Sequence, residues 1–135
     1  MKYLFYTAFF MAFVVSISAC KKSKTTTPPA AQEASIVFTT DANAANTSLS
    51  NTFPLAVTLT SAMPSASGIN IAATVIDQTN NATITQNAAV NSTAAINNIQ
   101  LINLPRQHWC TVTIKVTSVA TPSNFATKTF NVAYK

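Results

Sequence analysis

Short runs in which apolar and polar residues alternate are the sequence feature that most restricts how this chain folds. In residues 53–61, for example, Leu55, Val57 and Leu59 alternate with small or polar residues. Side chains of a β-strand have a period of two, so such a run buries one face and exposes the other. No stretch after Cys20 has the 3.6-residue period of an amphipathic helix. We therefore expect an all-β fold.

Seven such runs are predicted to be strands, because they are rich in Val, Ile, Thr and Phe and are separated by Asn, Ser and Pro. They cover residues 35–40, 53–61, 69–77, 83–86, 96–104, 109–119 and 125–134. In the fifth run the apolar phase shifts between Leu101 and Ile102, where we expect a β-bulge. Seven short strands predict a single antiparallel β-sandwich over residues 35–135. The predicted inward-facing residues of three later strands are Ile69, Ile71, Ala73 and Val75, then Cys110, Val112, Ile114 and Val116, then Phe130, Val132 and Tyr134.

The last third of the chain resembles a known class of sandwich. Leu104-Pro105 is followed by a short loop and by the run His108–Ile114, and Lys128–Val132 belongs to the final strand. These segments resemble the Leu-Pro turn and the last two strands of immunoglobulin-like and fibronectin type III-like modules of bacterial surface proteins. The resemblance implies an immunoglobulin-like sandwich. The chain departs from these families in having Cys110 where an inward-facing Tyr is usual.

The N-terminal segment has the organisation of an export signal. Lys2 precedes an apolar run from Leu4 to Ile17, small residues follow, and Lys21 and Lys22 end the apolar stretch. This order is that of a secretory signal peptide. The run is shorter than the roughly 20 apolar residues that cross a bilayer. We therefore expect residues 1–19 to be a cleaved signal helix.

The sequence Ile17-Ser18-Ala19-Cys20 resembles the lipobox of bacterial lipoproteins. The resemblance implies cleavage between Ala19 and Cys20 by signal peptidase II, with diacylglycerol attached to the Cys20 thiol. One acyl chain gives only reversible membrane binding, whereas a lipidated and acylated cysteine is held stably. Residues 20–34 would then be a lipidated cysteine and a disordered, flexible tether. The alternative is an ordinary signal peptide that contains a cysteine.

Most of the net charge of +5 lies near this anchor. Lys21, Lys22 and Lys24 follow the cysteine, where each basic residue adds roughly 1 kcal/mol of attraction to anionic lipid. From residue 34 onward four Lys or Arg face two Asp, a net charge of +2. They form no basic stripe of the kind that binds phosphates. We expect the membrane as a partner, together with another envelope protein or a glycan, and no nucleic acid.

The lipoprotein signal, the Lys-rich start and the Thr- and Asn-rich domain together resemble small lipoproteins of the Bacteroidetes group. Some of those carry an acidic run after the cysteine that directs them to the cell surface, whereas this chain has Lys21-Lys22-Ser23-Lys24. It also lacks the Asp after the cysteine that retains lipoproteins at the inner membrane of enteric bacteria. The resemblance implies the outer membrane, facing the periplasm, with the cell surface as the alternative.

Few residues of the chain can support acid–base or metal chemistry. After the signal the candidates are Glu33 in the tether, Asp41, Asp77, His108 and Cys110. Asp41 and Asp77 lie at strand ends, where Asp commonly makes turns. His108 and Cys110 point the same way on a strand, but no third ligand or orienting group accompanies them. We predict no catalytic residue, no metal and no cofactor, and hence a protein that is not an enzyme.

Trp109 is the residue best suited to contact a ligand, with His108 beside it. By alternation it points away from Cys110 toward solvent, where an indole stacks on a sugar or fills a partner's pocket. Alternatively, it covers the open end of the sandwich. The leading hypothesis is a non-enzymatic, membrane-anchored envelope module with an interaction or structural role. The alternatives are a carbohydrate-binding lipoprotein that uses Trp109 and an inhibitor of an envelope hydrolase that presents residues 104–108.

Overall fold

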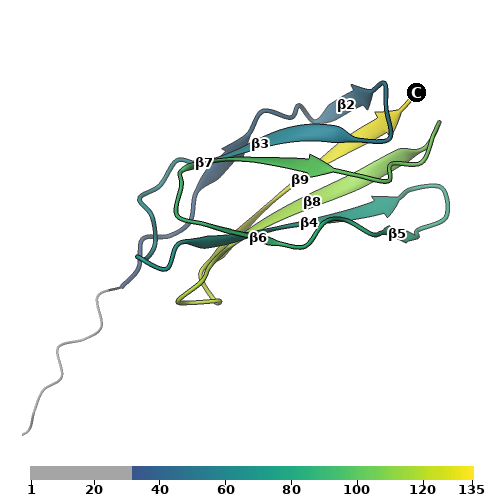
Figure 1. The fold of residues 1–135 in the computed structure, drawn as a ribbon. Helices are drawn as coiled ribbons and strands as arrows, with labels where there is room; N and C mark the ends of the chain where they lie inside the picture. The colour runs from purple at the N-terminus through teal and green to yellow at the C-terminus, as the bar shows by residue number, and fades with distance from the viewer. Residues whose placement is uncertain (1–31) are drawn as a thin grey trace, which may run out of the picture. The chain divides into compact units, whose positions relative to one another are not determined.

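The computed structural model describes residues 32–135, and this part of the chain contains nine β-strands (Figure 1). Their bounds are β1 Phe38–Thr40, β2 Ala45–Ser48, β3 Phe53–Leu59, β4 Ile69–Asp77, β5 Thr83–Ile84, β6 Val90–Ser92, β7 Ile96–Leu101, β8 Trp109–Ser118 and β9 Phe125–Tyr134. These described residues include no helix, so the predicted all-β class is confirmed. The signal peptide, Cys20 and most of the expected tether lie outside the described residues.

The strands form two sheets that pack face to face as a sandwich (Figure 1). One has the order β1-β3-β7, and the other has the order β2-β9-β8-β4-β5 with β6 also pairing with β4. Neighbouring strands are antiparallel except β2 and β9, which run parallel with Ala45 opposite Asn131. This pair departs from the antiparallel arrangement expected. The reason is that the chain changes sheets between β1 and β2, which brings β2 alongside β9 in the parallel direction.

The core lies between the inward faces of the two sheets. In β3 the side chains of Leu55, Val57 and Leu59 are at most 6% exposed, as the alternation predicts. The inward residues predicted for β4, β8 and β9 are also buried, except that Ala73 and Tyr134 are partly buried and pack against the core. The phases predicted for these four strands are confirmed.

Two strands were not expected, and five of the expected strands are shorter than predicted, among them β1, β5 and β7. β2 and β6 contain only four and three residues, and their sequences are mostly polar, so alternation does not reveal them. They exist because β9 and β4 offer them backbone partners. β7 ends at Leu101, and the Gln86 side chain bonds both the N–H and the C=O of Ile102. The prediction of a bulge there is wrong, because the phase change falls in a loop.

Asn124 connects the first described residues to the sandwich. Its Nδ2 donates to Oε2 of Glu33 at 3.1 Å and to the carbonyl of Ala34 at 2.9 Å. Its Oδ1 accepts the N–H of Ile36 at 3.3 Å. The hydrogen bond from Asn124 lowers the pKa of Glu33. Contacts with the domain therefore extend to Glu33, a residue of the segment 20–34.

Candidate functional site

Trp109 begins β8 on the outer face of the six-stranded sheet. Its side chain is 43% exposed, whereas the next residue, Cys110, is 1% exposed, so the predicted orientation is confirmed. Ala133 lies opposite Trp109 on β9, and the N–H of Gln78 donates to the Trp109 carbonyl at 2.9 Å. Neighbours on both sides therefore hold the Trp109 backbone, while much of the indole remains accessible.

Three neutral polar side chains beside Trp109 bond to one another. Nε2 of Gln78 donates to Oγ1 of Thr111 at 2.9 Å and to Oδ1 of Asn131 at 3.0 Å. Thr111 follows Trp109 by two residues on β8, so both side chains lie on the same face. We call Trp109, Gln78, Thr111 and Asn131 the tryptophan surface. Alternation placed Thr111 and Asn131 on the outer face, but Gln78 was missed because it enters from the turn after β4.

Asp77 and His108 form a close pair near the start of β8. Nδ1 of His108 lies 2.6 Å from Oδ2 of Asp77, which is only 3% exposed. The other carboxylate oxygen of Asp77 accepts the N–H of Thr79 at 2.8 Å, which is the turn role expected for this residue. Hydrogen bonds from His108, and next from Thr79, lower the pKa of Asp77. The pair holds His108 in place directly before Trp109.

The Cys110 thiol lies in the core, where the register of β4 and β8 places Cys110 opposite Asp77. Burial raises the pKa of Cys110 to about 11, and the charge of Asp77 adds to the effect. Because the thiolate is the nucleophilic form of cysteine, this thiol is a packing group at neutral pH. Asp41, the other candidate carboxylate in the domain, accepts the N–H of Ala56 at 2.9 Å. Within residues 32–135 no three His, Cys, Asp or Glu residues are grouped as metal ligands.

Backbone bonds hold the loop of residues 104–108 at both ends. The N–H of Leu104 donates to the carbonyl of Asn51 at 2.9 Å, and the N–H of Gln107 donates to that of Tyr134 at 2.6 Å. Leu104 is buried, whereas Arg106 and Gln107 are exposed. The part of this loop that can meet a partner is therefore its centre.

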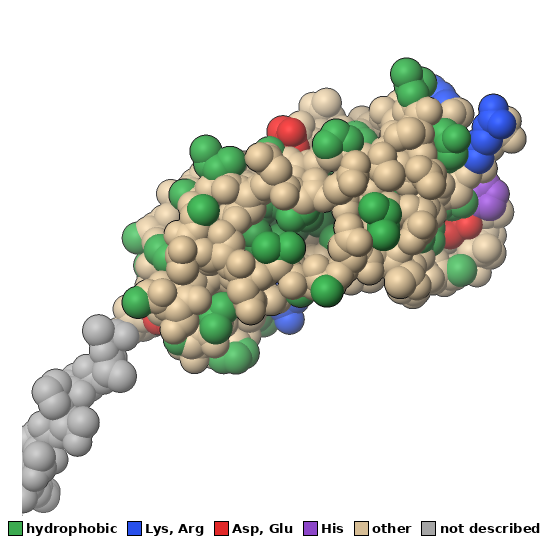
Figure 2. Space-filling model, viewed as in Figure 1, with side chains coloured by type: hydrophobic (Ala, Val, Ile, Leu, Met, Phe, Trp, Pro, Cys, Tyr) green, Lys and Arg blue, Asp and Glu red, His purple; other side chains and the backbone are tan. Residues whose placement is uncertain are grey.

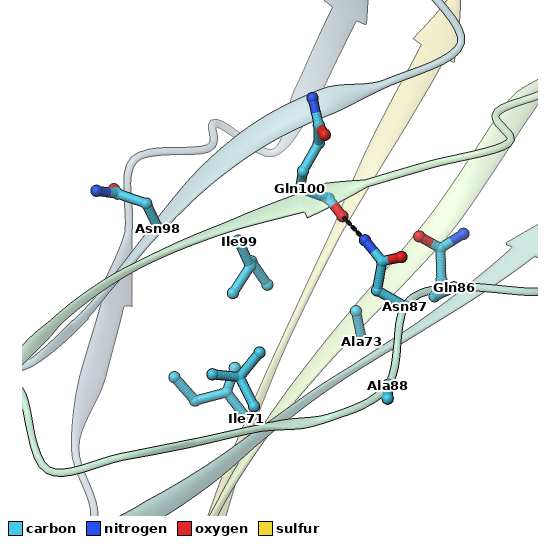
Figure 3. A pocket seen from close by; sticks show the side chains of 9 residues that line it. Ile71, Ala73, Gln86, Asn87, Ala88, Asn98, Ile99 and Gln100 are labelled. Carbon is cyan, nitrogen blue, oxygen red and sulfur yellow. Dashed lines mark hydrogen bonds between the residues drawn. The ribbon is translucent and has the colours of Figure 1, made fainter.

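A hollow of about 200 Å³ opens at the side of the sandwich, between β7 and β4 (Figure 3). Figure 3 shows Ile99 of β7 pointing across it toward Ile71 of β4, while Asn98 and Gln100 point away from it. Figure 2 shows hydrophobic side chains set into this face of the molecule, among a largely neutral surface. The residues that line the hollow are Ile71, Ala73, Gln86, Asn87, Ala88, Val90, Asn98, Ile99 and Gln100. Sequence reasoning missed this hollow because its walls come from three separate segments of the chain.

No family model, curated protein or solved structure matches this chain. Residues 32–135 contain no helix that is both long and apolar enough to cross a membrane. The fold and the two surface features, the tryptophan surface and the hollow, are therefore the basis for assigning a function.

Proposed function

We propose that this protein is a non-enzymatic binding module of the bacterial cell envelope, anchored by lipid on Cys20. The observation that carries the proposal is the exposed indole of Trp109, whose backbone has partners on both sides. Exposed Trp side chains are enriched among the residues that dominate binding energy at interfaces, because they bring a large apolar area and one polar group. The strand orders β1-β3-β7 and β9-β8-β4 correspond to strands A-B-E and G-F-C of immunoglobulin-type domains. This correspondence supports an immunoglobulin-like assignment for the sandwich.

The ligand class that suits the tryptophan surface best is an uncharged carbohydrate. The indole offers an apolar face for a sugar ring, while Gln78, Thr111 and Asn131 offer amide and hydroxyl groups for its hydroxyls. The Asp77 carboxylate, which lies next to Gln78 in the chain, is enclosed and already bonded to His108 and Thr79. All four side chains of the tryptophan surface are uncharged, so a neutral sugar is the ligand that complements them.

A glycan array probed with the purified protein tests this ligand class. We expect binding to at least one neutral glycan, and Trp109→Ala should weaken it by about tenfold or more, since truncating a Trp that dominates an interface costs roughly 2 kcal/mol or more. Phe125→Ala is the matched control, because Phe125 is 51% exposed on the same pair of strands but at their other end. Unchanged binding in Trp109→Ala would exclude the tryptophan surface as the site.

Cell fractionation tests the anchor. Cys20→Ser should move the protein from the membrane fraction to the soluble fraction, whereas Cys110→Ser, which changes the other cysteine, should leave it on the membrane. Retention of the Cys20→Ser variant on the membrane would contradict the lipid anchor. If the protein faces the periplasm at the outer membrane, protease added to intact cells should leave it uncut.

Inhibition of an envelope hydrolase is the second candidate function, and the fixed backbone of residues 104–108 favours it. Inhibitory loops bind with little loss of conformational entropy when they are held in place before binding. Pull-down from envelope extracts should then recover a hydrolase with the wild type and lose it in the Arg106→Ala, Gln107→Ala double variant. Absence of any hydrolase from the wild-type pull-down would count against this candidate.

A further inference from the structure

We propose that the free edge of β7 and the hollow beside it bind an extended, uncharged peptide segment of a partner protein. The segment would pair with β7 as an added strand and place one apolar side chain in the hollow. This site is distinct from the tryptophan surface, which lies on the outer face of the other sheet. It would give the module a second, independent means of holding a partner.

The first observation is the state of the β7 backbone. β7 pairs with β3 on one side and has no second strand neighbour among the described residues. On the open side the Gln86 amide bonds Ile102, whereas the Gln100 carbonyl has only a 3.5 Å contact with Nδ2 of Asn87. Backbone groups of alternate residues in a strand point the same way, so the N–H and C=O of Asn98 also face this open side. An unpaired edge of this kind is the template for strand addition.

The second observation is that the same edge already binds a peptide-like group. The Gln86 carboxamide donates to the Ile102 carbonyl at 2.8 Å and accepts the Ile102 N–H at 2.9 Å. A carboxamide has the donor and the acceptor of a peptide unit, so this pair reproduces the bonds that a neighbouring strand would make. Asn98 lies four residues before Ile102, and its backbone N–H and C=O face the same side. A bound segment would hydrogen-bond to them as the Gln86 carboxamide does to Ile102.

The third observation is the size and lining of the hollow. An apolar cavity of about 150 Å³ accommodates a benzene-sized molecule. The hollow here is about 200 Å³, with Ile71, Ala73 and Ile99 among its lining. One Leu, Ile or Phe side chain fits a space of this size. Because side chains of an added strand alternate, its next residues would point away from the hollow.

The absence of charge in the hollow indicates which kind of peptide segment it would bind. None of the residues that line the hollow is ionisable. A charged side chain entering it would lose hydration without gaining an ion pair. The sequence of β7, INNIQL, also lacks the Lys or Pro with which sheet edges are commonly protected from strand addition. The complementary segment is therefore neutral, with one apolar residue flanked by small or polar ones.

Selection of short random peptides on phage against the purified full-length protein tests the proposal. We expect enrichment of uncharged sequences in which apolar and polar residues alternate, with Leu, Ile or Phe at one fixed position. A synthetic peptide of the enriched sequence should slow amide hydrogen exchange at Asn98 and Gln100. It should leave exchange in the strand beginning at Trp109 unchanged.

A pair of variants at one position separates backbone pairing from side-chain contact. Asn98→Pro removes the edge N–H at a position where an edge strand tolerates proline. Asn98→Ala keeps that N–H. Losing one hydrogen bond and blocking strand approach should weaken peptide binding by about tenfold or more in Asn98→Pro. Asn98→Ala should bind more tightly than Asn98→Pro by that factor, because its backbone N–H remains. Ala73→Leu, which fills the hollow from β4 and leaves the β7 backbone intact, should weaken binding as well.

Four results would overturn the proposal. One is the absence of an enriched pattern, and a second is equal peptide binding by folded Asn98→Pro and Asn98→Ala. If Asn98→Pro does not fold, unaltered binding by Ala73→Leu together with unchanged exchange at Asn98 has the same consequence. A dimer in sedimentation that Asn98→Pro dissociates would instead assign the β7 edge to a second copy of this chain. Failure here leaves the glycan-array result for Trp109 unaffected, because the two sites share no residue.

Discussion

The two sheets of the sandwich differ in how completely their strands are enclosed. In the six-stranded sheet, β8 lies between β4 and β9, and its inward residues Val112, Ile114 and Val116 are 0% exposed. In the three-stranded sheet, β7 has one neighbour, and although its last residue Leu101 is 0% exposed, its inward residue Ile99 is only partly buried beside the hollow. The comparison teaches that one sheet supplies most of the buried core, while the other leaves backbone and apolar side chains accessible to a partner.

Truncating one isoleucine in each sheet tests this difference directly. Ile114→Ala should lower the free energy of unfolding by about 3–4 kcal/mol, because it leaves a cavity in a closed part of the core. Ile99→Ala should cost only about 1 kcal/mol, because its side chain already borders an open hollow. Urea denaturation of both variants measures the two values. Equal losses would show that the edge of the small sheet is as tightly packed as the centre of the large one.

The next largest effect on stability is expected where the start of β4 meets β6. Gly68 has a φ of +80°, and a Cβ added there would lie 2.2 Å from the Ser92 carbonyl oxygen of β6. Gly68→Ala should cost about 1–3 kcal/mol from its backbone conformation alone, and more if β6 is displaced. Asn81→Gly, at a φ of 58°, is the control and should change stability little, because glycine adopts that conformation freely. Thermal unfolding of the two variants compares them. If Gly68→Ala were as stable as the wild type, neither the backbone conformation at residue 68 nor the contact with β6 would require glycine.

The Asp77–His108 pair predicts a smaller effect that depends on pH. The pKa of Asp77 is lowered below its ordinary value of 3.8, so folding favours the carboxylate. This contribution to stability is present above pH 3.8 and is lost as the pH falls through the lower folded-state pKa. Asp77→Asn lacks it, so the stability difference between wild type and variant should shrink in that acid range. Urea midpoints at neutral pH and in steps below pH 3.8 check this. A difference that stays constant would contradict the role given to the carboxylate.

The extent to which each strand could be predicted follows its length and alternation, and not the sheet to which it belongs. The sequence of β8, WCTVTIKVTS, alternates along its whole length, so its strand, phase and outward-facing Trp109 could all be predicted. The short strands β2 and β6 are mostly polar and exist only because longer strands lie beside them. The early end of β7 depends on Gln86, a side chain from another segment.

The candidate site also depends on contacts between distant segments, which the sequence does not predict. The exposure of Trp109 follows from local alternation, but the pairing of Asp77 with His108 joins residues 31 positions apart. Gln78 reaches Thr111 and Asn131 only because β4, β8 and β9 are neighbours in that order. The hollow likewise needs β4, β7 and the segment before β6 to meet. No spacing along the chain predicts such neighbours.

By itself, the sequence determined the all-β class, the inward faces of the long strands and the orientation of Trp109. These are local properties, because side chains of a strand alternate whatever the strand lies beside. The prediction of lipid on Cys20 also comes from the sequence alone. Only the tertiary structure decided the parallel β2–β9 pair, the Asp77–His108 contact and the open edge of β7 with its hollow. These depend on which distant segments become neighbours, and that is settled by packing of the whole domain.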